Sequence, residues 1–430
     1  MKKNMMKTRI WGCLMVAAVC MNAMAQGGTK SPYSQFGLGT LSDVSQGMSR
    51  GMNGVGLALQ QGDQVNTLNP ASYGGVDSLT MLFDAGVTLQ ATNYKEGSAK
   101  QNGSMANLEY VVGSFRAWKG VGMAFGVRPF SSVGYSYSST SNLGNSNGTM
   151  AETYSGSGGL HEVFLGAGWQ VTRQLAVGAN VGYLWGDLKR SVTSSGGTNV
   201  NTLMKTYAAS VSNYKIDLGA QYRQRIGRKD LLTVGATVGI GHQLKAEPEM
   251  SIVIVNTTGT TDTTTFKVKD GLKLPMTYGV GAAYNHAGRL TMAADLMLEK
   301  WGGIDFPSFN SQTNQYVLTS GLLKDRTKVN VGVDWLPTTN VLNRHYLSHV
   351  HYRMGAGLAT PYYKINGQDG PKELSVSAGL GIPVLTGRSW VNVSFQWAHT
   401  SAKDLITENS FRLNIGVTFN ERWFAKWKVE

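Results

Sequence analysis

The chain contains little of what stabilises small exported domains or interrupts regular backbone pairing. It has 2 Cys and 10 Pro among 430 residues, and 15% of its residues are charged, against roughly 25% in soluble domains. After residue 25, no uncharged apolar run approaches the ~18 residues that a transmembrane helix needs. These scarcities exclude a disulfide-stapled fold and a helical membrane protein, and favour extensive backbone pairing.

The N-terminus has the three regions of a secretory signal peptide. Four basic residues lie within 1–9, an apolar stretch follows at 10–19, and Ala-Met-Ala occupies 23–25. This pattern predicts cleavage near Ala25/Gln26. A retained membrane helix is the alternative, but the apolar stretch is shorter than a span of about 20 residues. Both cysteines lie in the removed segment, so the mature chain is expected to have no Cys-based metal site.

The mature chain is basic. Removing the four signal-peptide cations from the formal net charge of +13 leaves about +9. Such a charge suits nucleic acid or an anionic lipid surface. For an exported protein we expect outer-membrane lipid and lipopolysaccharide as the partner, and no nucleic acid.

What the sequence has in abundance is glycine, with 54 residues, and period-two alternation of apolar and polar side chains. Clear examples run from Leu79 to Leu89, from Leu175 to Trp185 and from Phe411 to Phe419. Such alternation predicts strands with one apolar face. Fourteen segments fit: 79–93, 105–118, 121–139, 159–170, 174–188, 205–224, 230–247, 271–287, 289–301, 324–337, 346–363, 372–383, 388–400 and 410–420. An extra hairpin is expected at 250–268.

Short and long connections alternate along the chain. Two residues link the second and third segments, whereas 140–158, 189–204, 248–270 and 302–323 are expected to be long polar loops. This alternation is typical of outer-membrane barrels, and an even strand number places both chain ends in the periplasm. A soluble β-sandwich is the alternative, but soluble strands average about five or six residues. We therefore predict an all-β fold, a 14-stranded antiparallel transmembrane β-barrel.

Residues 26–77 lack a good strand pattern. A disordered tail is one interpretation. However, the segment carries more apolar residues than a solvated linker needs, and a barrel of about fourteen strands leaves an open lumen. We therefore predict a luminal hatch, or plug. The predicted organisation is a signal peptide at 1–25, a hatch at 26–77, a barrel at 78–420 and a basic-aromatic tail at 421–430.

The stretch SRGMNGVGLALQQGDQVNTLNPASYGGVDSLTM resembles the N-terminal signature of the FadL-like family of outer-membrane transporters of hydrophobic compounds. The match is specific over about 45–81. The resemblance implies a hatch inside a fourteen-stranded barrel, anchored at Asn69, Pro70 and Ala71, with mobile glycines at Gly51, Gly54 and Gly56. It also implies lateral exit near a kinked third strand, where Pro129 lacks a ladder donor. The alternative is that the sheet accommodates Pro129 as a bulge with no opening in the wall.

The resemblance implies uptake of hydrophobic small molecules such as long-chain fatty acids, through an apolar pocket above the hatch. The alternative is a non-transporting accessory or scaffold barrel of a secretion or assembly complex, with protein partners at the cell surface. A continuous apolar cavity above residues 50–60 favours transport, and a polar, blocked lumen favours the scaffold.

The sequence has no motif for an enzyme, a cofactor or a metal. There is no P-loop, no G-x-S-x-G and no H-E-x-x-H. His349 and His351 are expected on one strand face, but without a nearby carboxylate they do not predict a metal site. The charged residues within the predicted strands are expected to line the lumen as pairs: Asp84, Glu109, Arg116, Lys215, Asp217, Asp295, Asp334 and Arg412.

Overall fold

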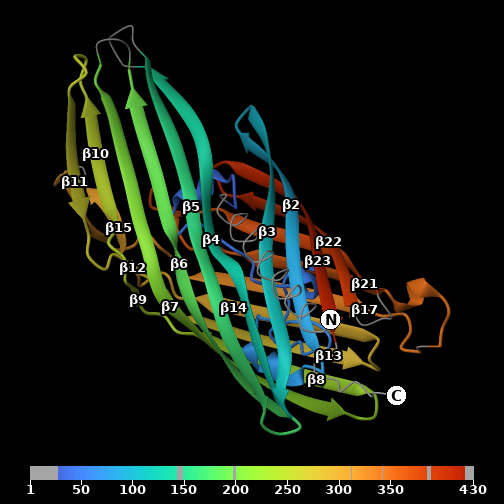
Figure 1. Ribbon diagram of the computed structural model, residues 1–430. Coiled ribbons are helices and arrows are strands. Elements are labelled where there is room, and N and C mark those ends of the chain that lie inside the picture. The colour runs from blue at the N-terminus through green and yellow to red at the C-terminus, as the bar shows by residue number, and fades with distance from the viewer. Residues whose placement is uncertain are drawn as a thin grey trace, which may run out of the picture.

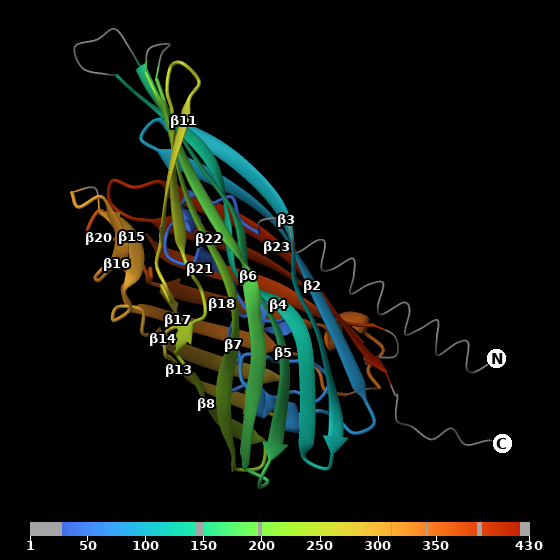
Figure 2. The same cartoon turned by 60° about the vertical axis from the view of Figure 1, so that its left-hand side comes forward.

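The computed structural model describes residues 28–142, 149–196, 200–310, 312–340, 342–384 and 389–421. The predicted signal peptide at 1–25 lies outside these residues, as does all but the first residue of the predicted tail at 421–430. The dominant feature is one large antiparallel sheet that closes on itself (Figures 1 and 2).

Fourteen strands form the closed antiparallel barrel, which confirms the predicted fold class. In chain order they are β2 (Met81–Glu96), β3 (Ala99–Trp118), β4 (Val121–Asn142), β5 (Thr149–Gln170), β6 (Leu175–Ser195), β7 (Thr202–Ile226), β8 (Asp230–Gly239), β13 (Thr277–His286), β14 (Leu290–Glu299), β17 (Arg326–Trp335), β18 (His351–Ala359), β21 (Lys372–Val384), β22 (Ser389–Ser401) and β23 (Thr407–Glu421). The first and last strands pair from Met81↔Glu421 to Lys95↔Thr407, which closes the barrel.

The period-two pattern decides which face of each strand points outward. Along β6, for example, Val181 is 57% exposed whereas Leu184 is fully buried. Exposed Val, Leu, Phe and Trp side chains recur on the outer face of nearly every strand. Such an outer apolar surface suits lipid, because outer-membrane barrels alternate apolar-out with polar-in.

Strands β4 to β7 continue well beyond the shorter strands and form a tall extension, visible at the upper left of Figure 1. The long polar loops expected at 140–158 and 189–204 are therefore largely wrong, because strand pairing continues through most of both ranges. Side-chain packing across the strands supports this pairing around 140–158. The rings of Tyr137 and Tyr154, for example, stack at 4.9 Å.

The extra hairpin expected at 250–268 is present as β10 (Glu249–Val255) and β11 (Thr261–Lys267). It is not an isolated loop, because β10 pairs with the outer part of β7 and so widens the tall extension. Strand β11 pairs only with β10 among the described strands and forms the outer edge of the sheet.

Residues 28–77 lie inside the barrel and include four short elements: η1 (Pro32–Gln35), β1 (Thr40–Leu41), α2 (Gly47–Gly51) and η2 (Pro70–Gly75). Most of the side chains between residues 44 and 73 are buried. None of the helices in the described ranges is long and apolar enough to cross a membrane.

Short paired elements lie in the connections between the later wall strands: β9 (Gln243–Leu244), β12 (Leu272–Lys273), β15 (Phe306–Asn310), β16 (Gln315–Thr319), β19 (Lys364–Ile365) and β20 (Gln368–Asp369). An apolar core joins these connections to the walls and to the N-terminal segment. It includes Leu38, Leu160, Leu244, Trp301 and Tyr362. On the opposite side, η3 (Tyr346–His349) precedes β18.

Candidate functional site in the barrel lumen

Arg50 joins the N-terminal segment to three wall strands. Its guanidinium donates to the Ser45 and Asp43 carbonyls at 3.0 and 3.1 Å. It also donates to Thr88 Oγ1 at 2.9 Å and Asn414 Oδ1 at 3.0 Å, and forms an ion pair with Glu109 at 3.0 Å. These contacts account for all five N–H groups of a buried guanidinium, so α2 is held in one position against β2, β3 and β23.

Arg128 makes a second connection, between the segment and β4, β5 and β7. Its Nε lies 3.1 Å from Glu162 Oε2, and its Nη1 donates to Thr67 Oγ1 at 2.9 Å. Lys215 pairs with both Glu162 and Asp217. Arg128 and Glu162 are almost completely buried, so this network is expensive to break unless both signs of charge are removed together.

Two further carboxylates hold α2 and the loop after it. Asp295 accepts the backbone N–H groups of Gly56 and Leu57 at 2.7 and 2.9 Å. Asp334 pairs with Arg353 at 3.0 Å, and the Arg353 side chain packs against Gly51. The mobile glycines that the resemblance implies therefore lie in closely packed surroundings. Gly54 has a φ of +83°, which a side chain would strain.

The expected anchor, Asn69-Pro70-Ala71, lies at the start of η2 and contacts strand β7. Asn69 caps η2 by accepting the Ala71 N–H at 3.0 Å, and its own amide donates to the Leu57 carbonyl at 2.8 Å and to that of Ala220 in β7 at 3.1 Å. Gly219 of β7 leaves the space that the Asn69-Pro70 pair occupies.

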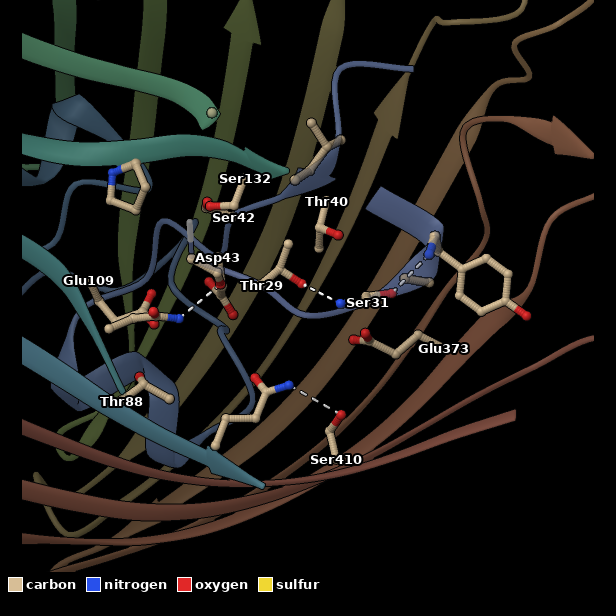
Figure 3. A pocket seen from close by; sticks show the side chains of 18 of the residues that line it. Thr29, Ser31, Thr40, Ser42, Asp43, Thr88, Glu109, Ser132, Glu373 and Ser410 are labelled. Carbon is tan, nitrogen blue, oxygen red and sulfur yellow. Dashed lines mark hydrogen bonds between the residues drawn. The ribbon is translucent and has the colours of Figure 1, made fainter. Parts of the chain in front are cut away.

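A cavity of about 490 Å³ remains between the segment and the outer core. Its lining is mostly polar, and Figure 3 shows Asp43, Glu109, Glu373 and several hydroxyl side chains around it. Burial alone would raise the pKa of Asp43. However, the positive charges of Lys328 and Arg50 and the Ser45 N–H outweigh burial and hold the pKa of this carboxyl well below its usual range.

The wall is incomplete beside this cavity. Pairing between β3 and β4 ends at Val111↔Val127, and the two strands then diverge (Figure 1). Pro129 follows immediately, and the pairing of β4 with β5 continues past it with a bulge before Ser131. Cavity-lining residues lie on both sides of the divergence, at Asn107 and Ser132.

The first described residues occupy the resulting gap. The Gly28 carbonyl accepts the Asn107 side-chain N–H at 2.9 Å, and the Gly134 N–H donates to Ser34 Oγ at 3.1 Å. Further along the segment, Thr40 pairs with Ser132 of β4. The segment thus contacts both strands that border the gap.

The charged residues expected in the lumen are only partly arranged as predicted. Glu109, Lys215, Asp217, Asp334 and Arg412 make ion pairs. Asp84 and Asp295 are buried but accept hydrogen bonds from Tyr110 and from backbone N–H groups, and Arg116 donates to the Trp118 carbonyl.

Arg50, Arg128 and Glu162 were not predicted from the sequence. Arg128 and Glu162 occupy inward-facing positions of the period-two pattern in their strands, and this pattern could have indicated that they face the lumen. Arg50 has no comparable signal, because α2 is a single short helix. His349 lies in η3 and His351 in β18, so the expectation that they share a strand face is wrong. No group of three or more potential ligands for a metal occurs among the described residues.

The family model of BamG matches residues 5–430. The chain belongs to the BamG family. No curated protein matches this BamG-family chain. Among solved structures it is similar to the Pseudomonas putida toluene transporter TodX (15% identity, TM-score 0.61, 91% of this chain and 100% of that one). It is similar as well to the Ralstonia pickettii toluene transporter TbuX (15%, 0.61, 89% and 98%) and to a Pseudomonas aeruginosa FadL homologue (9%, 0.61, 88% and 99%).

At these identities the likeness is one of fold, and it confirms the FadL-like resemblance at that level. The fold is that of outer-membrane transporters. These structural neighbours are transport channels rather than enzymes.

Proposed function

We propose that this BamG-family barrel is a closed, non-transporting structural subunit of an outer-membrane assembly or secretion complex. The outer-membrane location is supported by the fold and by the apolar outer surface. The complex would contain protein partners at the cell surface, in line with the scaffold alternative drawn from the sequence.

The observation that carries this proposal is the polar, blocked lumen. Residues 28–77 fill it and are tied to the walls by the buried networks of Arg50, Arg128 and Arg353. The cavity above them is lined mainly by charged and hydroxyl side chains. An apolar solute placed there would desolvate those groups without satisfying them, which is unfavourable. The apolar side chains at the mouth pack on each other instead.

The tall extension supplies the surface that a scaffold needs. Strands β4 to β7, with β10 and β11 beside them, rise beyond most of the other strands (Figure 2). The free edge of β11, which pairs with none of the described strands other than β10, carries the exposed run Thr261–Thr265. Exposed edges of this kind are templates for pairing with another polypeptide.

The test combines two readouts in a strain lacking the gene. We expect uptake of labelled toluene and oleate to remain unchanged, and the abundance of surface-exposed outer-membrane proteins to fall. Complementation by the wild-type gene should restore that abundance. Loss of uptake with an unchanged outer-membrane proteome would overturn the proposal.

A second candidate is the uptake of hydrophobic small molecules such as long-chain fatty acids, and one observation favours it. The wall gap beside Pro129 gives the cavity a lateral route, provided that Gly28 and Thr29 move aside. On this account the glycines Gly51, Gly54 and Gly56 shift while Asn69-Pro70 stays fixed.

A further inference from the structure

A groove of about 870 Å³ lies on the outer face of β2, β3, β21, β22 and β23, away from the lumen. Four of its residues form one row across adjacent strands, because Ala91 faces Phe411, Phe411 faces Trp397, and Trp397 faces Val376. Phe395 borders the next row. Phe395 and Phe411 are 65% and 61% exposed. Their rings therefore project from the sheet and border the groove, whose other lining residues include smaller side chains.

The same outer face becomes polar and then basic further along the strands. Beyond Ala91, Asn93 donates to Asn102 at 2.7 Å, and Lys95 then lies directly opposite Lys100. Like charges in directly opposed positions destabilise a sheet. Neither lysine forms an ion pair with any residue in the described ranges. An anion beside the two lysines would relieve this repulsion.

The vertical spacing fits an amphipathic lipid. Lys95 is four residues beyond Ala91, and Lys372 is four residues before Val376 on β21. At a rise of about 3.4 Å per residue, each lysine is roughly 14 Å from the groove. Half of a hydrocarbon core about 30 Å thick is of similar size. Lys95 and Lys100 flank the β2–β3 turn, at the end of β3 opposite the short β3–β4 turn. Short turns of such barrels face the periplasm, so this end faces the outer leaflet.

We propose that this groove binds an acyl chain of a phosphorylated glycolipid of the outer leaflet, with its phosphate between Lys95 and Lys100. The inference rests on the proposed outer-membrane location but not on whether the barrel transports solutes. It assigns one binding site to lipopolysaccharide, which the sequence led us to expect as a partner.

Native mass spectrometry of the full chain, delipidated and titrated with purified lipid A, tests the site. We expect K95Q/K100Q to weaken lipid A binding at least fivefold, and F395A/F411A to weaken it by a similar factor. The matched control K189Q/K269Q removes two exposed lysines elsewhere and should stay within twofold of wild type. Deacylated lipopolysaccharide should bind much more weakly than lipid A.

Equal lipid A binding by wild type and K95Q/K100Q would overturn the proposal. Equal binding of phosphatidylglycerol and lipid A would overturn the assignment to a glycolipid. Heat-modifiable electrophoretic mobility shows that the barrel is folded in every sample. Cell fractionation shows whether the protein is in the outer membrane. A folded outer-membrane barrel that fails to bind lipid A contradicts only this inference, whereas a chain absent from the outer membrane contradicts the proposed location.

Discussion

At the residue scale, single arginines determine how firmly the luminal segment is held. Arg50, within α2, uses all its donors on the loop before α2 and on three strands. Arg128 of β4 links Thr67 to Glu162 of the neighbouring strand β5. A short helix such as α2 has little stability of its own, so its position depends on these tertiary contacts.

Replacing Arg50 should therefore loosen the segment. We expect Arg50→Met to cost about 3–5 kcal/mol, because Glu109 is left as an uncompensated, mostly buried charge. Hydrogen exchange over residues 43–69 should rise while exchange in β13 and β14 stays unchanged. The double variant R50M/E109Q should recover part of the loss, and strictly additive effects of the two substitutions would contradict the ion-pair explanation.

Asp43 predicts a pH dependence of stability. Because its folded pKa is depressed, the charged carboxylate stabilises the fold above the unfolded pKa of about 3.9. This contribution is lost as the pH falls towards the folded pKa. The difference in thermal midpoint between wild type and Asp43→Asn should be constant from pH 8 to 5 and shrink below about pH 4. A difference that grows on acidification would show that another group is responsible.

At the scale of elements, the wall gap and the segment that fills it decide between the two candidate functions. A Cβ added to Gly28 would lie 3.4 Å from Ser132 Cβ, close to the 3.5–4.5 Å found in disulfides. The variant G28C/S132C should therefore form a bond that locks the segment into the gap, with no competing cysteine expected in the mature chain.

We expect this oxidised variant to support surface-protein delivery as well as its reduced form and the two single variants do. Lateral uptake requires the segment to leave the gap, so the second candidate function predicts uptake only after reduction. Uptake of oleate that disappears on oxidation and returns with reductant would favour that candidate.

The β10–β11 hairpin offers a separable test of docking. Replacing residues 250–266 by a short Gly-Ser linker removes strands outside the fourteen-strand barrel. The barrel should still fold and show heat-modifiable mobility, whereas partner proteins recovered by affinity purification should be lost. A linker of the same composition inserted at the β2–β3 turn, Gly97-Ser98, serves as the control and should retain them.

At the scale of the whole molecule, the sequence was sufficient for the barrel but not for its extension or its lumen. The fourteen alternating segments predicted the strands because burial on one face imposes period two. The same rule failed in the expected loop at 140–158, where the chain around Tyr154 carries mainly small polar residues and pairing with β4 extends the strand. The bulges beside Pro129 and Gly86 likewise depend on neighbouring strands.

The luminal networks were less predictable, because they join residues far apart in sequence. Glu109 and Asp295 were expected in the lumen, but their partners Arg50 and Gly56 lie in a segment without periodicity. The sequence predicted the Asn69-Pro70-Ala71 anchor, and only the folded chain brings Asn69 against Gly219. Local pattern predicts which face a residue takes, whereas its partner depends on closure of the barrel.

In the proposed function the lumen is closed to solutes and the barrel serves as a scaffold. The most direct test uses cells whose only copy of the protein is the oxidised G28C/S132C variant. It measures the protein composition of the outer membrane and the uptake of toluene and oleate in the same cells. We predict a wild-type complement of surface proteins together with no dependence of toluene or oleate uptake on reductant. A normal surface proteome combined with uptake that requires reduction would contradict the claim.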